Sequence, residues 1–385
     1  MMKTISVSKR KMAQVRELCL AGLSPCELMP ALLEALHEVL GSSRNLFDWT
    51  DTAGRLLRYD IEGPVDPQIA RLYFERFHNR QEVECMPAFA SIRHAPAGVR
   101  GALELKTEAF FNSALYHEVW KPQHFHSRIE GVVRGSAGQL LGSLVLYRSA
   151  KDSDFDSEDE QALATLLPWV ARGLESTKIS RDDEHFLPSP ERTETLLVGP
   201  DAELRHATAG AFRLLLQMDC GLTPVTVSRP SDTWSCLLRK LFGSALEELR
   251  AGGGGRAMTL INAAGCFLVE FSRLHPWAVG DGLVQIQVRR LEAHEVALHR
   301  VLREQGLSAA QIRVCAATYA GRTSVELAQE LGVAISTVVD HLRKAYRALN
   351  VRDGAGMRRD VDRRVAQLNL CGVSSRWASL CAPNP

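Results

Sequence analysis

The chain has 385 residues, of which 45% are hydrophobic and 24% are charged, the composition of an ordinary globular protein. This length exceeds that of one common domain, so we expect two or three domains, and the composition excludes a disordered, collagen-like or disulfide-scaffold protein. The formal net charge is only +1. No basic field therefore covers the whole chain, and any nucleic-acid-binding surface must be local.

The nine cysteines form no Cys-x-x-Cys pair, and their number is odd. The first residues, MMKTISVSKRKMAQVRELCLAG, interrupt their apolar positions with charges and offer no secretory core. No apolar run reaches the ~18–20 residues of a membrane span. We therefore expect a cytoplasmic protein with reduced cysteines, no membrane contact, no metal site and no cofactor.

Changes in composition predict the domain organisation. Residues 179–192 are polar and contain two prolines, which is typical of a linker. They separate a mixed α/β region at 1–178 from a second region at 193–291, where short strands surround a small helical centre. A connecting helix at 292–306, an all-α four-helix region at 307–368 and a tail at 369–385 follow. The predicted fold class is multidomain α+β.

In the first region, the patterns within Leu18–Leu40 and Ile69–His78 predict helices. Two β-rich runs at 127–135 and 138–149, joined by the turn Gly135-Ser136-Ala137-Gly138, predict a hairpin. An acidic turn then precedes an apolar stripe. It predicts a helix that begins near Ser157, with Ser157 as N-cap and Glu160 three residues later.

The second region predicts a strand, a turn and a second strand start within 193–208, and a helix at 211–218. The runs at 257–274 and 282–291 predict a hairpin or neighbouring strands. The glycines at 252–255 lack the Lys-Ser/Thr ending that a phosphate-binding P-loop requires, so we expect a plain loop there.

Three helices are expected within 307–351. The first ends near Gly321, and the second has Thr323 as N-cap and Glu326 as its capping-box partner, ending at Gly332. The third spans Ile335–Leu349. Helix, short glycine-containing turn and helix form the helix-turn-helix arrangement.

The third helix carries polar residues opposite its apolar face. Small polar residues near its start suit base edges, and cations near its end suit phosphates. Residues 307–367 hold 10 Lys and Arg against 6 Asp and Glu, a local charge of +4. The alternative is the solvated face of an ordinary helical bundle. The candidate DNA-binding residues are Thr323, Ser336, Thr337, Val339, Asp340, His341, Arg343, Lys344 and Arg347.

This segment resembles the C-terminal helix-turn-helix of the LuxR/NarL/FixJ transcriptional regulators. The resemblance rests on Leu307-Ser308, Gly321, Glu326-Leu327-Ala328, Gly332-Val333, Ser336-Thr337-Val338, His341-Leu342, Tyr346, Leu349 and Val351. It implies binding of double-stranded DNA at a two-fold-related operator by a homodimer. Family habit favours activation, which would make RNA polymerase a further partner.

Several positions depart from the family pattern. Ala334-Ile335 replaces the usual Ser-Pro at the start of the third helix, which removes the side-chain N-cap. Ser336 and Val339 stand where lysines are common, and Asp340 stands where Asn is frequent. We therefore expect an operator unlike that of the relatives. A degenerate helix-turn-helix that acts through protein contact is the alternative.

Residues Phe110–Leu174 resemble the GAF-like sensor of one-component LuxR regulators, and the second region is similar, more loosely, to a PAS-like module. The resemblance implies a small-molecule ligand whose signal would pass through the helix Leu291–Gln305. Candidate ligand-contacting residues, each also explicable as core, are Tyr59, Phe89, Tyr116, Trp120 and Phe125. A metal or haem role for His117, His124, His126 and Cys85 is an alternative to ordinary surface histidines.

Catalytic motifs are missing from the sequence. It holds no G-x-S-x-G, H-E-x-x-H or P-loop. The expectation is therefore a regulator and not an enzyme.

Overall fold

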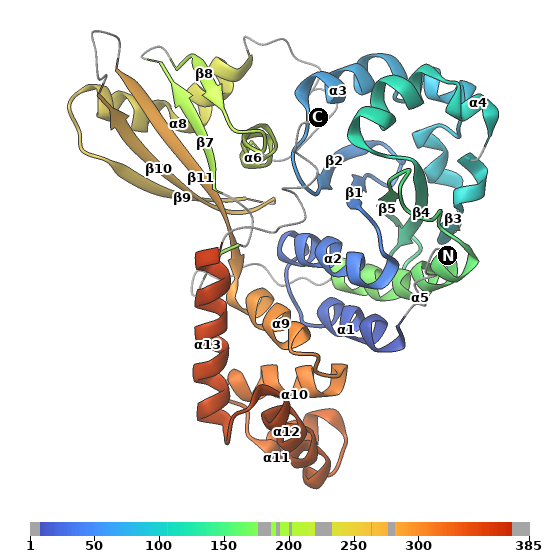
Figure 1. Cartoon of the computed structure of the whole chain (residues 1–385), viewed down its shortest axis with the longest axis vertical. Helices are drawn as coiled ribbons and strands as arrows, with labels where there is room; N and C mark the ends of the chain where they lie inside the picture. The colour runs from blue at the N-terminus through green and yellow to red at the C-terminus, as the bar shows by residue number, and fades with distance from the viewer. Residues whose placement is uncertain are drawn as a thin grey trace.

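The computed structural model describes residues 8–105, 107–175, 186–189, 193–199, 202–219, 233–262, 264–275 and 282–371. Two antiparallel sheets, each packed against helices, are followed by a C-terminal group of helices (Figure 1). The fold is therefore multidomain α+β, as the sequence predicts. None of the described helices is long and apolar enough to cross a lipid bilayer.

The first sheet has five strands in the order β2-β1-β5-β4-β3. The predicted hairpin is confirmed, since its two strands pair antiparallel around the expected turn. The strands are β1 (Arg44–Thr50), β2 (Leu56–Ile61), β3 (Gly98–Arg100), β4 (Ser127–Arg134) and β5 (Leu140–Arg148).

Three helices cover one face of this sheet: α1 (Lys9–Cys19), α2 (Pro25–Leu40) and α5 (Ser157–Leu174). Their apolar residues form one buried cluster with Phe47 and Leu144 of the sheet. Gly131 of β4 permits the close approach of α5, because a Cβ at this position would lie 2.5 Å from a methyl carbon of Leu167.

The other face carries short helical segments and an aromatic cluster. The expected single helix over 69–78 is α3 (Pro67–Leu72), which continues into a π-helical turn at Tyr73–Phe77. Phe77, Phe110, Trp120, Phe125 and Tyr147 pack together there. The remaining segments are Gln81–Glu84, Phe89–His94, Ala102–Leu105, α4 (Glu108–Phe111), Tyr116–Trp120 and Lys121–Gln123.

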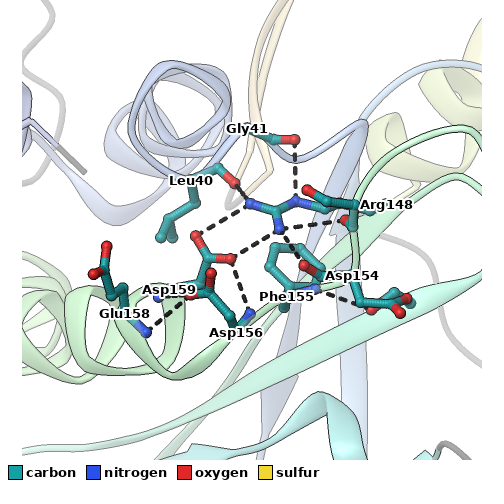
Figure 2. A network of polar contacts seen from close by, with 10 residues as sticks. Leu40, Gly41, Arg148, Asp154, Phe155, Asp156, Glu158 and Asp159 are labelled. Atoms are coloured by element: carbon teal, nitrogen blue, oxygen red, sulfur yellow. Dashed lines mark hydrogen bonds and ion pairs between the residues drawn. The ribbon is translucent and has the colours of Figure 1, made fainter. Parts of the chain in front are cut away.

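A buried arginine joins the end of β5 to α2 and α5 (Figure 2). Nη1 of Arg148 lies 2.8 Å from Oδ2 of Asp159, and Nη2 donates to Oδ1 of Asp159 and to the carbonyl oxygen of Leu40. Its guanidinium carbon lies 4.0 Å from the ring centre of Phe155. Both charged side chains are about 5% exposed. Because little water reaches them, the charge of each is compensated mainly by the other and by hydrogen bonds.

This network also corrects the expected N-cap of α5. The helix begins at Ser157, but the N-cap is Asp156 and its capping-box partner is Asp159, not Ser157 with Glu160. The Asp156 carboxylate accepts hydrogen bonds from the amides of Glu158 and Asp159, while Asp159 accepts from the amide of Asp156. Arg148 binds the same Asp159 carboxylate, so the long-range ion pair and the local capping box share one residue.

The second sheet has the order β8-β7-β11-β10-β9, with β6 also pairing β11. Its strands are β6 (Phe186–Pro188), β7 (Glu194–Val198), β8 (Leu204–Ala207), β9 (Arg256–Asn262), β10 (Gly265–Leu274) and β11 (Leu283–Ala293). The predicted helix is confirmed as α6 (Ala211–Met218), and α8 (Thr233–Arg250) packs beside it. Tyr59, Ile61 and Val65 of the first region belong to the same buried cluster.

Strand β6 departs from the expected linker. Residues 179–192 were expected to join two regions as plain linker, but Phe186–Pro188 pair with Ala293–Leu291 of β11. The amide of Ser189 then donates to the carbonyl oxygen of Arg290 at 3.0 Å. Backbone pairing thus overrides the polar composition of this stretch. The rest of the linker, apart from Ser189, lies outside the described residues.

In the last described stretch, 294–371, the helices are α9 (His294–Glu304), α10 (Ala309–Tyr319), α11 (Ser324–Leu331), α12 (Ile335–Leu349) and α13 (Gly354–Cys371). The predicted helices over 307–351 are confirmed. Helix α9 starts two residues after the expected connecting helix, because β11 continues to Ala293. Helix α13 includes the first three residues of the expected tail, and residues 372–385 lie outside the described part.

Replacing Arg148 should test the buried ion pair. Arg148→Leu leaves the carboxylate of Asp159 buried without its cation, so we expect the free energy of unfolding to fall by about 3–5 kcal/mol. Urea denaturation followed by circular dichroism measures the change. Arg172→Leu, on the exposed surface of α5, is the control and should change it by less than about 0.5 kcal/mol. Equal effects of the two variants would contradict the prediction.

Candidate functional site

The helices α11 and α12 form the arrangement expected from the sequence. Thr323 accepts a hydrogen bond from the amide of Glu326, and Glu326 Oε2 accepts from the amide of Thr323 at 2.8 Å. Helix α11 then ends at Gly332, whose φ of 62° suits a residue without a Cβ. Three residues, Gly332 to Ala334, join the two helices. The predicted capping box and turn are therefore confirmed.

The start of α12 lacks a side-chain cap. Ala334 occupies the N-cap position with extended backbone angles, and no side chain bonds to the free amides of the first turn. The other end is closed by Asn350, which has a φ of 56° in the left-handed region. Packing on the rest of the bundle must therefore hold the first turn of α12 in place.

Helix α12 separates an apolar face from a polar face. Val338, Leu342, Ala345 and Leu349 are buried. The sequence-predicted residues that lie on the exposed surface are Ser336, Thr337, Val339, Arg343, Lys344 and Arg347, while Asp340 and His341 are partly exposed. Thr323 is exposed at the start of α11, where capping already uses its hydroxyl group. The structure thus brings eight of the nine candidates together on one helix.

An ion pair modifies the polar face of α12. Nζ of Lys344 lies 2.7 Å from Oδ2 of Asp340, one helical turn away. The hydrogen bond from Lys344, with its charge and those of Arg343 and His341, lowers the pKa of Asp340 below its ordinary value. Lys344 is therefore engaged by a carboxylate, whereas no ion pair of Arg343 or Arg347 occurs among the described residues.

Four exposed apolar side chains lie on or near this face, and sequence reasoning named only one of them, Val339. Val325, Val333, Ile335 and Val339 are 51%, 41%, 48% and 39% exposed, and all lie on α11, the turn or the first half of α12. We call these four residues the valine patch. The sequence could have indicated them, because none of the four lies at a position on the buried face of α11 or α12. Exposed apolar side chains that adjoin one another can form a contact surface for a partner molecule.

The first region contacts the C-terminal helices directly through α1. Nε2 of Gln14 donates to the carbonyl oxygen of Leu307 at 2.6 Å, and Nε of Arg313 on α10 lies 2.6 Å from Oε2 of Glu17. This hydrogen bond raises the pKa of Arg313. Figure 1 shows α1 directly beside α10. The sequence signal was weak: two polar residues, Gln14 and Glu17, that occupy the buried face of α1.

Helix α9 is anchored by one buried arginine. Arg300 forms two hydrogen bonds with Glu292 of β11, and its Nε lies 3.0 Å from Oε2 of Glu34 on α2. Burial opposes ionisation of Glu34, but the charges of Arg300 and Arg303 lower its pKa below the ordinary value. Three parts of the chain that are distant in sequence therefore meet at Arg300.

The five candidate ligand-contacting residues do not form one group. Trp120 and Phe125 are buried with Tyr147, and the rings of Phe125 and Tyr147 stack at 4.0 Å. The hydroxyl group of Tyr116 lies 2.9 Å from Nδ1 of His126. Phe89 contacts the ring of His78, and Tyr59 packs on Phe74 in the cluster shared with the second sheet.

The histidines near residue 120 show no grouping that suits a metal. His126 stacks on Phe111 and contacts Tyr116, and His124 adopts a φ of 61° at the end of a short helical turn. His117 is exposed, with its ring beside that of Tyr116. Among the described residues, no group of three or more His, Cys, Asp or Glu could hold a metal ion.

Comparison with known proteins adds little. No protein-family model matches the chain, and no curated protein matches it. Among solved structures, it is similar to the E. coli DhaR(N)–DhaL complex, with 11% identity over 75% of this chain and 93% of that one, at a TM-score of 0.24. It is also similar to the sensor region of a sensor histidine kinase, with 12% identity over 73% and 90%, at a TM-score of 0.18. Both TM-scores are too low for either likeness to carry an argument.

Restoring a side-chain cap should stabilise α12. Ala334→Ser supplies an oxygen that can accept from the free amides of the first turn, and the backbone angles at Ala334 already suit an N-cap. We expect the free energy of unfolding to rise by about 1 kcal/mol, measured by urea denaturation of the full chain. The control, Ala348→Ser on the exposed surface of the same helix, should slightly destabilise. The same effect from both variants would show that capping is not the cause.

The burial of His299 on α9 should make stability depend on pH. Burial lowers the pKa of His299 to about 4, although Glu17 opposes the shift, and Arg303 adds to it. In the unfolded chain the imidazole of His299 therefore binds a proton below pH ~6.5, whereas in the folded chain it does so only near pH ~4. Stability should fall as the pH drops through this window, by up to about 1.4 kcal/mol per pH unit.

His299→Gln removes the titrating group and should flatten this dependence. Urea denaturation at several values between pH 7.5 and about pH 5 measures the slope for both proteins. His206→Gln, on the exposed surface of β8, is the control. Parallel pH profiles of wild type and His299→Gln would show that His299 does not titrate differently on folding.

Proposed function

We propose that this protein is a DNA-binding transcriptional regulator of the LuxR type, acting in the cytoplasm. The observation that carries the proposal is α12: a helix that follows a three-residue turn, buries one face in the bundle and exposes polar and cationic side chains on the other. Such a helix fits the major groove of double-stranded DNA, which admits one α-helix.

The residues of α12 divide into two roles in this proposal. Arg343, Lys344 and Arg347 near its end contact phosphates and set affinity. Ser336, Thr337 and Asp340 near its start contact base edges, and the carboxylate of Asp340 can accept a hydrogen bond from a cytosine amino group. Val339 can contact a thymine methyl group. His341 lies beside these residues, and Thr323 lies at the start of α11.

A homodimer follows from the way such helices read DNA. Two copies placed about one helical turn apart bind a two-fold-related operator. Helix α13 is a candidate for the dimer contact near DNA, with the N-terminal regions supplying more area. We infer activation of transcription, with RNA polymerase as a further partner.

The N-terminal regions would sense a small molecule. An antiparallel sheet with helices on its faces occurs twice, which supports a GAF-like region at 1–178 and a PAS-like region at 193–291. The aromatic residues around Trp120 remain candidates for ligand contact. Coupling requires that the ligand bind the DNA-competent and incompetent arrangements with different affinity. The contacts at Arg300 and at Glu17 with Arg313 provide routes for it, in addition to the helix at 291–305.

A second candidate function has one observation in its favour. The valine patch is apolar, one of its residues, Val339, stands where lysine is common in the family that the segment resembles, and Asp340 engages Lys344. A helix-turn-helix of this kind could bind a protein instead of DNA. Association through an apolar patch depends weakly on salt, whereas DNA binding weakens steeply as salt rises.

Removing cations from α12 should weaken binding to all DNA sequences. We expect Lys344→Ala/Arg347→Ala to lower affinity at low salt and to reduce the slope of log K against log salt by about 4, because the proposed homodimer loses two phosphate contacts in each of its two copies. Fluorescence anisotropy with fragments selected from a random DNA pool measures both. The control, Arg239→Ala/Lys240→Ala on α8, removes the same charge from a distant helix.

Asp340→Asn should instead change base preference, which a repeated selection detects. If the double variant of α12 retains both affinity and salt slope, the placement of α12 in the groove is wrong. If the wild-type protein selects no DNA at any salt concentration, with or without the N-terminal regions, the protein-contact alternative is supported.

A further inference from the structure

A cavity of about 600 Å³ lies where three parts of the chain meet. Its wall includes Pro30 of α2 from the first region, Gln217 of α6 and Arg290 of β11 from the second, and Val296 of α9. This volume is within the range of small-molecule sites, which occur preferentially between domains. None of the five candidate residues named from the sequence contributes to this wall.

The wall combines apolar surface with a few buried polar groups. Leu33, Ile61 and Phe186 supply part of the apolar surface. Gln217 and Ser189 are 1% and 4% exposed, and the side-chain oxygen of each has no hydrogen-bond partner among the described residues. A buried polar atom left without a partner is costly. A ligand that donates hydrogen bonds to these two oxygens would offset the free-energy cost of burying them.

Most charged groups of the wall already have partners. Glu34 and Glu292 bind Arg300, Asp60 lies 3.6 Å from Arg58, and Glu62 lies 2.8 Å from Nε2 of His37. Among the described wall residues, carboxylates outnumber guanidinium groups by six to three. Two of these cations are already engaged: Arg300 by Glu34 and Glu292, and Arg290 by backbone carbonyl oxygens at 3.0 Å. An anionic ligand would therefore meet few available donors.

Glu194 is the clearest acceptor on this wall. Its Oε2 accepts from the amide of Gly210 at 3.1 Å and from the hydroxyl group of Thr208, whereas Oε1 accepts no hydrogen bond from a described residue. No cation of the described chain forms an ion pair with it. A positively charged donor in the cavity would form an ion pair with Glu194 and donate a hydrogen bond to its Oε1.

We propose that this cavity binds a small organic molecule with an apolar body and a protonated amine, and that Glu194 contacts the amine. The body would lie against Leu33, Ile61 and Phe186. If the proposed function holds, this molecule is the regulatory ligand, because it would contact both sensor regions and α9, the helix that precedes α10. The binding itself does not depend on that function.

Matched probes of opposite charge test the class of ligand. The full-length protein is mixed with 2-phenylethylamine or tryptamine, and separately with 3-phenylpropanoate or indole-3-propanoate, which have the same aromatic bodies. Saturation-transfer NMR and thermal unfolding measure binding up to about 10 mM of each probe. We expect at least one amine to bind about tenfold more tightly than its matched acid.

Two variants and a control test the site. Ala209 is an exposed wall residue, so Ala209→Trp should fill part of the cavity without disturbing the core and should weaken amine binding at least about tenfold. Ala207→Trp, exposed on β8 and outside the wall, should leave binding unchanged. Glu194→Gln should abolish the preference for the amine over the acid.

Each other outcome overturns the proposal. Equal or tighter binding of the acids contradicts the ligand class, and amine binding that survives Ala209→Trp contradicts the site. No binding of either amine up to about 10 mM contradicts both. None of these measurements involves DNA, so they separate a failure of this proposal from a failure of the proposed regulator function, which DNA selection reports.

Discussion

The arrangement of this molecule depends on Arg300. Its guanidinium group binds Glu34 of α2 and Glu292 of β11 while the residue itself lies on α9, so one side chain joins the first region, the second region and the helix that leads into the C-terminal bundle. It is only 6% exposed. Removing one partner of such a buried group would leave uncompensated charge, a cost of about 3–5 kcal/mol. Separating the three parts would break the ion pairs of Arg300 with Glu34 and Glu292, which is energetically costly.

A second contact constrains the C-terminal bundle from the opposite end of the chain. Glu17 and Gln14 of α1 bond to Arg313 and to the backbone at Leu307, next to the start of α10. The proposed DNA-binding helices are thus attached both through α9 and through α1. A change in how the first two regions pack would therefore shift the bundle both through α9 and through the contact of α1 with α10. A signal passed along α9 alone would use only the first of these connections.

The valine patch and the ion pair on α12 bear on the proposed recognition of DNA. Val339 exposes an apolar side chain and Asp340 pairs with Lys344, while Arg343 and Arg347 stay exposed without an ion pair to any described residue. Fewer available cations mean a smaller contribution from counterion release. Discrimination would then rest more on methyl and amino groups of the bases, so the same residues that weaken affinity also define a different operator.

The sequence by itself determined the elements whose signals are local. The capping box of Thr323 with Glu326, the end of α11 at Gly332 and the limits of α12 all depend on residues within one or two turns of each other. The hairpin of β4 and β5 likewise follows from its own turn. Local hydrogen bonds and hydrophobic periodicity suffice for such features, since no distant partner competes with them.

Only the tertiary structure decided features that need partners distant in sequence. Arg148 of β5 binds Asp159 in the first turn of α5, and Phe186–Pro188 form a strand by pairing with Leu291–Ala293 of β11. The contact of α1 with α10, the meeting of three regions at Arg300 and the cavity beside it combine residues up to about three hundred positions apart. No periodicity records such pairs, because buried ion pairs and cavities arise only when separately folded surfaces pack together.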